Sequence, residues 1–221
     1  MRNALPYIGR AEGRGVVWID PRKVTHYAGS KHAHYHRLLQ YGRIGATLRV
    51  LQRRAPFLAL EGDWDLKAIP LELEPKYLNV SDYVAHYPDF RSSRWYAEYA
   101  QALARKGSLG HKKFLVRSTA ELDRLFEDYI AGLHDSLRDK GYVQLPGVDI
   151  GSAVVDREGR LMKVGSGTHR FFFARELGVS PVPLVVRFVH ILWLERLGIT
   201  LDPADRDRLV DAVEDVGRRY A

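Results

Sequence analysis

The pattern of hydrophobic and polar positions is most regular in the second half of the chain. Ser118 and Glu121 have the spacing of a capping box, in which a hydroxyl and a carboxylate bind free N–H groups at a helix start. Apolar residues then recur three or four positions apart, which predicts one helix with a single buried stripe. These residues are Leu122, Leu125, Phe126, Tyr129, Ile130, Leu133 and Leu137. Gly141 follows as the C-terminal cap.

The segment after this helix predicts two strands, a glycine turn and a second helix. Residues 148–155 and 161–164 are typical of paired strands, and Asp156-Arg157-Glu158-Gly159 is typical of the hairpin turn between them. The turn Gly165-Ser166-Gly167-Thr168 then opens a helix over 169–177, which Gly178 ends.

Weaker patterns complete the expected organisation. The β-branched run 183–189 predicts a buried strand, and Asp202-Pro203 predicts the start of a last helix over 202–220. In the first half, residues 15–21 predict a short buried strand and residues 93–106 a helix. We therefore expect an α+β fold, since the strands lie too close together in sequence for a doubly wound nucleotide-binding fold.

Composition narrows the function classes. Of 221 residues, 46% are hydrophobic and 28% are charged, as in an ordinary globular protein. The absence of cysteine excludes disulfides, thiolate metal sites and thiol catalysis. No apolar run reaches the roughly 20 residues of a membrane span, and Met1 to Pro6 lack a signal-peptide pattern, so we expect a cytoplasmic protein.

Positive charge is concentrated in residues 1–60. This segment holds eleven basic and two acidic residues, a net charge of +9, whereas the rest of the chain carries −2. Such a surface attracts polyanions, so nucleic acid is a possible partner of residues 1–60. A solvated basic surface without a dedicated partner is the alternative interpretation.

The glycine turn is the strongest chemical signal. Two glycines allow a ligand to approach the backbone closely, and the following helix start favours an anion. Thr168 supplies a hydroxyl, His169 a group that exchanges protons near neutral pH, and Arg170 a planar fork for phosphate oxygens. The alternative is a purely structural strand-to-helix turn.

Residues 122–189 resemble the superfamily of the ParB N-terminal domain and sulfiredoxin. The resemblance lies in five short stretches: Lys140-Gly141-Tyr142-Val143-Gln144, Asp156-Arg157-Glu158-Gly159-Arg160, Gly165-Ser166-Gly167-Thr168-His169-Arg170, Ala174-Arg175-Glu176-Leu177-Gly178 and Val182-Pro183-Leu184-Val185. Family members carry a similar G-x-H-R turn, a helix with a Leu-Gly end, and a V-P-V strand. Glu61-Gly62-Asp63-Trp64-Asp65 also looks like a motif of uncharacterised ParB-like proteins.

The resemblance implies a small mixed sheet with flanking helices, elaborated by the basic N-terminal region. It implies one domain over 1–221, with the core at 113–190, the first strand at 15–24, an insertion at 25–112 and the C-terminal helix at 202–220.

The resemblance also implies nucleotide handling, with ATP or CTP phosphates held by Gly165, Ser166, Gly167, Thr168, His169 and Arg170. The family includes a sulfinic acid reductase, CTP-dependent DNA clamps and a free-serine kinase.

Two positions depart from the family pattern. Sulfiredoxin activity needs a cysteine where this chain has Thr168, so that activity is excluded. The kinase and many relatives carry an aspartate where this chain has Ser166. A phosphotransferase needs a carboxylate to bind Mg²⁺ or to orient the acceptor hydroxyl, and Asp63 and Asp65 are the candidates by chemical type. The alternative for these two residues is an acidic turn beside a packed Trp64.

The leading hypothesis is an ATP-dependent phosphotransferase acting on a small hydroxylated or glycan acceptor, or a related nucleotide hydrolase, with His169, Asp63 and Asp65 as catalytic residues. The alternatives are a non-catalytic nucleotide-binding regulatory protein and a ParB-like DNA-associated protein. His32, His34 and His36 would share one face of a strand and so suggest a metal site. We favour a solvated or phosphate-facing loop there, because Lys31 and Arg37 flank the three histidines.

Overall fold

The computed structural model describes residues 15–29, 58–112, 114–143 and 150–221. The chain divides into two compact units. The first unit comprises Met1–Leu71, Gln144–Thr168 and Pro181–Ala221, and the second comprises Glu72–Val143 and His169–Ser180. Strands and helices occur together in both, so the α+β class is confirmed.

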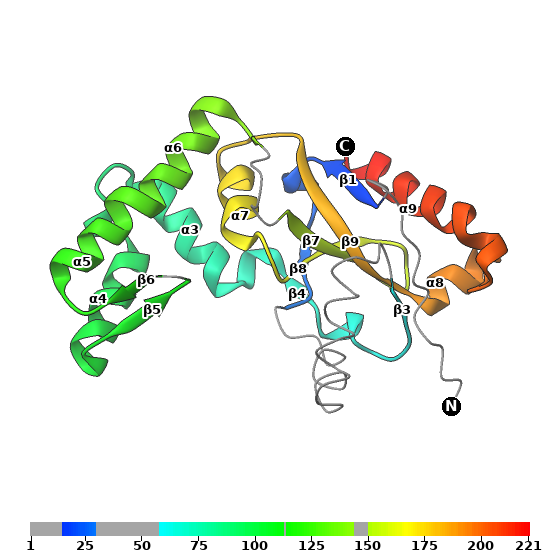
Figure 1. Cartoon of the computed structure of the whole chain (residues 1–221), viewed down its shortest axis with the longest axis horizontal. Helices are drawn as coiled ribbons and strands as arrows, with labels where there is room; N and C mark the ends of the chain where they lie inside the picture. Colours follow the sequence, from blue (N-terminus) through cyan, green and yellow to red (C-terminus); the bar gives the residue numbers. More distant parts are fainter. Residues whose placement is uncertain (1–14, 30–57, 113, 144–149) are drawn as a thin grey trace. The chain divides into compact units, whose positions relative to one another are not determined.

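A mixed sheet is the centre of the first unit (Figure 1). Its strands are β1 (Val16–Ile19), β2 (His26–Tyr27), β3 (Leu58–Leu60), β4 (Ile69–Pro70), β7 (Gly151–Val155), β8 (Leu161–Val164) and β9 (Val182–His190). The strand order is β1-β9-β7-β8-β2-β4, and β3 also pairs with β9.

The long strand β9 organises this sheet. Along one edge it pairs with β7 in parallel; it also pairs antiparallel with β1 and parallel with β3. Strands β7 and β8 form the predicted antiparallel hairpin, and every residue in both is buried. Burial of both faces explains why the sequence shows continuous apolar runs there rather than alternation.

Among the described residues of the first unit, the helices are α8 (Ile191–Arg196) and α9 (Arg206–Tyr220). The predicted start of the last helix at Asp202-Pro203 is wrong. A 3₁₀ turn occupies Pro203–Asp205, and the Asp202 carboxylate accepts the Ala204 N–H within that turn. The Asp205 carboxylate accepts both the N–H and the hydroxyl of Thr200, and α9 begins only after Asp205.

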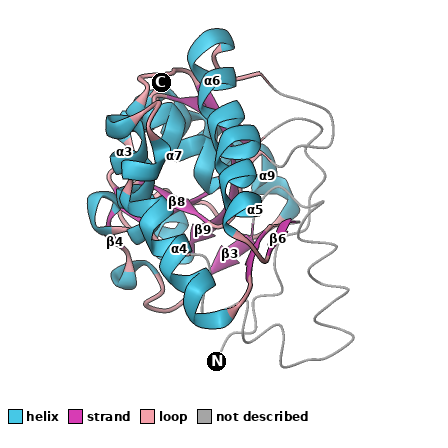
Figure 2. Ribbon diagram, turned by 90° about the vertical axis from the view of Figure 1, so that its left-hand side faces the viewer, coloured by secondary structure: helices cyan, strands magenta, loops and turns pink. Residues whose placement is uncertain are grey.

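The described residues of the second unit form helices and one short hairpin, whose strand β6 is labelled in Figure 2. Its helices are α3 (Pro75–His86), α4 (Arg94–Lys106), α5 (Thr119–Arg124), α6 (Ala131–Lys140) and α7 (Thr168–Glu176), the first residue of which is in the first unit. Its strands are β5 (Leu109–His111) and β6 (Phe114–Val116). The core is aromatic, since the fully buried Tyr83 packs against Trp95, Phe126 and Phe173.

The helix predicted over 118–141 is present with two differences. The Ser118 hydroxyl accepts the Glu121 N–H as expected, but the Glu121 carboxylate accepts the N–H of Arg117 rather than that of Ser118. A π-helical turn over Leu125–Ile130 separates α5 from α6. A spacing of three and four residues does not distinguish such a turn from a continuous α-helix. Gly141 ends α6 with φ 65°, as predicted.

Candidate functional site

The glycine turn connects β8 to α7. Gly165 has φ 48° and Gly167 has φ 67°, a region that glycine occupies at little cost. A Cβ on Gly167 would lie 2.6 Å from the Cα of Gly151, whereas one on Gly165 would meet nothing within 4 Å. Gly167 is therefore required by close packing against the start of β7, while Gly165 is required only by its backbone angle.

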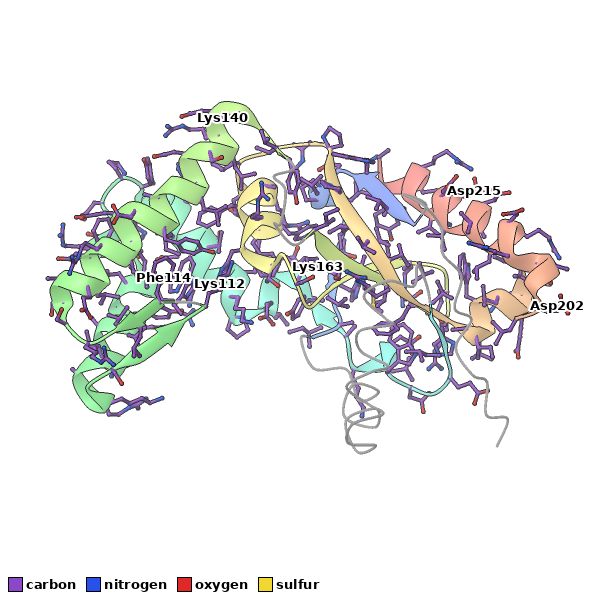
Figure 3. All side chains as sticks on the ribbon, in the orientation of Figure 1. Lys112, Phe114, Lys140, Lys163, Asp202 and Asp215 are labelled. Carbon is purple, nitrogen blue, oxygen red and sulfur yellow. The ribbon has the colours of Figure 1, made fainter. Side chains whose placement is uncertain are left out.

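A lysine side chain that the sequence analysis missed holds the turn from the buried side. Lys163 in β8 is fully buried, and its ammonium group donates to the carbonyl of Val164 at 2.5 Å and to that of Ser166 at 2.7 Å (Figure 3). The hydroxyl of Thr168 donates to the carbonyl of Gly165. Three successive carbonyls of the turn, those of Val164, Gly165 and Ser166, thus accept hydrogen bonds from side chains.

The Ser166 hydroxyl faces oxygen atoms of the neighbouring strand. It lies 2.8 Å from the hydroxyl of Ser152 and 3.3 Å from the carbonyl oxygen of Ile150, to which it donates. Arg187 Nε donates to the Ser152 hydroxyl at 3.4 Å. This position suits a hydroxyl that donates, whereas a carboxylate would place its negative charge against the Ile150 carbonyl.

His169 is held in the second unit as a neutral imidazole. Its ring stacks on that of His111, with centroids 5.2 Å apart and planes within 10°, and lies 5.1 Å from the Trp95 ring. Burial lowers the pKa of His169 to about 3, and the nearby His111, Lys112 and Lys76 contribute to the same effect. At neutral pH this imidazole can donate or accept a hydrogen bond but carries no charge.

Arg170 is also engaged in the second unit. Its Nη2 donates to the carbonyl of Val143 at 2.7 Å, and its guanidinium lies 4.4 Å from the centre of the Tyr142 ring. The planar fork predicted to bind phosphate is therefore directed at least in part to the end of α6 and the residues after it.

The two predicted acidic residues bind an arginine. Arg157 Nε and Nη2 each donate to the Asp65 carboxylate at 2.8 Å, and Nη2 also donates to Asp63 at 2.8 Å. The Asp65 side chain is 2% exposed and that of Asp63 is 74% exposed. Burial raises the pKa of Asp65, but hydrogen bonds from Arg157 and the nearby His190 more than offset this, and its pKa lies below the ordinary value. Asp65 is therefore a buried, neutralised anion.

His190 completes this cluster, which we call the Asp65–Arg157 cluster and define as Asp63, Asp65, Arg157 and His190. His190 Nε2 donates to the carbonyl of Gly62 at 2.8 Å, and Nδ1 accepts the Leu192 N–H at 3.1 Å. The Trp64 ring stacks on the His190 ring at 5.5 Å. The packed Trp64 that the alternative interpretation expected is thus present, with 5% exposure.

The structure does not bring the acidic residues to the glycine turn. Arg157 lies in the hairpin turn after β7, whereas Gly165 follows the other end of β8. Four strand residues, each advancing the chain by about 3.3 Å, separate the two turns. The Asp65–Arg157 cluster and the glycine turn therefore occupy opposite ends of the β7–β8 hairpin.

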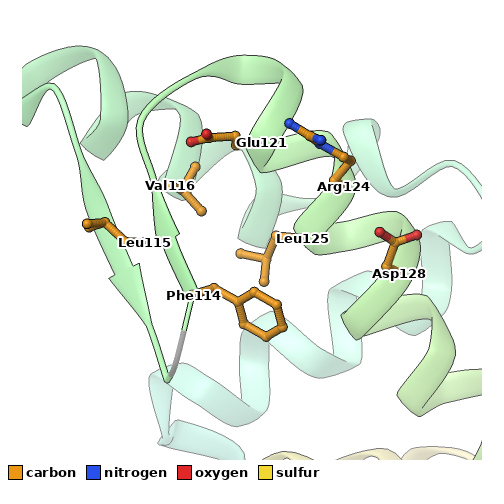
Figure 4. A pocket seen from close by; sticks show the side chains of 7 residues that line it. All are labelled: Phe114, Leu115, Val116, Glu121, Arg124, Leu125 and Asp128. Atoms are coloured by element: carbon orange, nitrogen blue, oxygen red, sulfur yellow. The ribbon is translucent and has the colours of Figure 1, made fainter.

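A hollow of about 310 Å³ lies elsewhere, in the second unit between β6 and the helix that follows it (Figure 4). It is lined by Phe114, Leu115, Val116, Glu121, Arg124, Leu125 and Asp128. None of the predicted site residues is among these lining residues.

Several predictions concern residues outside the described ranges. His32, His34 and His36 and most of the basic residues of 1–60 lie there. In the described ranges, no group of three or more acidic or histidine side chains is placed to hold a metal ion. Within these same ranges, no helix combines the length and apolar character needed to cross a membrane.

No protein-family model matches the chain, and comparisons with curated proteins and with solved structures found no significant match.

Proposed function

We propose that this chain binds a phosphate-bearing ligand, most simply a nucleotide, at the glycine turn over residues 165–168, in a ParB/sulfiredoxin-like fold. The observation that carries this proposal is the direction of the turn's peptide groups. In a trans peptide the C=O and the following N–H point in opposite directions. Because the Ser166 carbonyl points to the buried Lys163, the N–H of Gly167 points away from it.

Thr168, where α7 starts, adds a further donor to the turn. The first N–H groups of a helix have no acceptor within the helix, and the helix dipole is positive at this end. Thr168 is the first residue of the nine-residue α7 and directly follows Gly167. A phosphate oxygen at this position would accept hydrogen bonds from the backbone, the arrangement found in many phosphate sites.

The geometry favours binding without phosphoryl transfer. The carboxylates expected to serve Mg²⁺ or an acceptor, Asp63 and Asp65, form ion pairs with Arg157 at the far end of the hairpin. His169 has its pKa lowered to about 3, which makes it a weak general base at neutral pH. The non-catalytic nucleotide-binding protein is therefore the function that this site supports best. ATP-dependent transfer with Mg²⁺ and binding of nucleic acid by residues 1–60 remain predictions.

A thermal-shift experiment tests this proposal. The purified chain is melted with ATP, CTP, GTP, ADP and pyrophosphate, each with and without Mg²⁺. A ligand at a hundred times its Kd should stabilise the folded chain by about 2.7 kcal/mol. Thr168→Glu should abolish the shift, because it places a negative charge at the ligand position while suiting the start of a helix.

Thr119→Glu is the matched control, since Thr119 is the first residue of α5. The proposal is wrong if no ligand raises Tm, or if both variants keep the wild-type shift. The same mixtures are analysed for nucleoside diphosphate and free phosphate. Release that depends on Asp63 or Asp65 would instead support phosphoryl transfer.

A further inference from the structure

Lys163 is unusual because a charged side chain stands in a fully buried strand. All four residues of β8 are buried, and Lys163 has no exposed surface. Strands β7 and β2 flank β8, so the backbone of Lys163 is part of the sheet while its side chain reaches the glycine turn. Transferring an ammonium ion from water into a protein interior costs several kcal/mol, so this residue needs strong compensating contacts.

Two of those contacts determine the shape of the turn. The ammonium group binds the carbonyl of Val164 at 2.5 Å and the carbonyl of Ser166 at 2.7 Å. Each bond fixes one peptide plane, and therefore fixes the direction of the N–H that follows. The N–H after Val164 belongs to Gly165 and donates to the carbonyl of Gly29 at 3.3 Å. The N–H after Ser166 belongs to Gly167, the donor that the proposed function assigns to the ligand.

We propose that Lys163 is a positioning residue of the phosphate site, which acts by holding the Ser166–Gly167 peptide with its N–H toward the ligand. This inference rests on the proposed function. The Ser166 carbonyl also accepts the Ser152 N–H at 3.3 Å, so without the ammonium group it keeps only this longer hydrogen bond. Since Gly167 can adopt many backbone conformations, the peptide can then rotate and direct a carbonyl oxygen at the anion. The ligand would meet a repulsive oxygen in place of a hydrogen-bond donor.

The direct test uses pyrophosphate as the probe and compares Kd by calorimetry. Lys163→Met, which keeps the length and apolar stem of the side chain, should weaken binding by tenfold or more. Val154→Ala is the control, because it removes buried volume from the adjacent strand β7, in the cluster that includes Met162 and Val164, and removes no group that binds the Lys163 ammonium. Val154→Ala should lower Tm but leave Kd within about twofold of the wild-type value. This is the result expected of a variant that reduces stability without changing the binding site.

A second measurement applies to the wild type and does not depend on the folding of any variant. In the full chain labelled with ¹⁵N-glycine, saturating pyrophosphate should shift the Gly167 amide signal strongly. The Gly165 signal should shift little, because its N–H already donates to Gly29. The inference is overturned if pyrophosphate binds but Gly167 does not shift, or if Lys163→Met binds as tightly as the wild type. Absence of binding to the wild type would instead refute the proposed function.

Discussion

The imidazole rings of His111 and His169 stack with their planes within 10° of each other, although 57 residues separate them in sequence. Trp95 lies against both rings, and the Tyr99 hydroxyl is 2.9 Å from His111 Nδ1. Burial, with a smaller contribution from the neighbouring Lys112, lowers the pKa of His111 to about 4. The folded second unit therefore holds two neutral histidines side by side.

These two histidines predict an acid-sensitive stability. In the unfolded chain each imidazole has a pKa near 6.5. In the folded chain the pKa is about 4 for His111 and about 3 for His169. The unfolded state thus binds more protons between these values, and the free energy of unfolding falls as pH falls from 6.5 toward 4. At pH 5 the loss relative to pH 7 should be about 2 kcal/mol for each histidine.

Urea unfolding at pH 7 and pH 5 measures this loss. His169→Phe keeps a ring for stacking and removes the titrating group, so its loss between the two pH values should be clearly smaller. His86→Gln, at an exposed histidine of α3, serves as the control and should follow the wild type. If His169→Phe lost as much stability between pH 7 and pH 5 as the wild type, the lowered pKa of His169 would not be a cause of the acid sensitivity.

The unequal burial of Asp63 and Asp65 predicts unequal roles in stability. Asp65→Asn should destabilise the chain by about 2–3 kcal/mol, because it breaks the pairing of a buried carboxylate with Arg157. Asp63→Asn should change the free energy of unfolding by about 0.5 kcal/mol or less, because exposed ion pairs contribute little. Chemical denaturation of both variants provides the comparison. Equal losses would show that the Asp65–Arg157 cluster does not stabilise the fold as described.

The two glycines of the turn should respond differently to alanine. Gly167→Ala would bring a Cβ within 2.8 Å of both the Cα and the N of Gly151, and backbone atoms cannot move aside cheaply. Gly165→Ala meets open space and should lose about 1–2 kcal/mol for its left-handed backbone alone. Differential scanning calorimetry should therefore show a markedly larger fall in Tm for Gly167→Ala. A larger fall for Gly165→Ala would contradict the packing of the turn on β7.

Local patterns predicted much of the fold. The hairpin β7–β8, the glycine turn, α7, β9 and α4 all lie where the sequence places them, because turns, caps and apolar runs are encoded by neighbouring residues. Helix α3 was not predicted. Its buried residues Asn79, Val80 and Tyr83 include a polar side chain, so its apolar stripe is weak in the sequence.

The site was less predictable because its contacts join distant segments. Asp65 and Arg157 are 92 residues apart, and nothing near either one indicates the other. Lys163 resembled an ordinary charged residue in a return strand, since only the three-dimensional structure shows its ammonium group beneath the turn. His169 was expected to exchange protons near neutral pH. Its pKa is lowered mainly by burial and further by His111, Lys112 and Lys76, and all of these effects come from other segments of the chain.

The position of Ser166 predicts that a family-like aspartate would impair this chain. Ser166→Asp would set a carboxylate against the Ile150 carbonyl, 3.3 Å from the present hydroxyl, and beside the proposed phosphate site. We expect a loss of about 1–3 kcal/mol of stability, because a partly buried carboxylate would lack donors on that side. We also expect pyrophosphate binding to weaken at least tenfold, because the added negative charge repels the ligand.

Ser166→Asn is the control, since it has nearly the same shape as aspartate without the charge and retains a donor for Ile150. Calorimetric titration of the wild type, Ser166→Asp and Ser166→Asn with pyrophosphate measures the three Kd values. Tighter binding by Ser166→Asp, or phosphoryl transfer by it alone, would mean that the turn still accommodates the chemistry of the family.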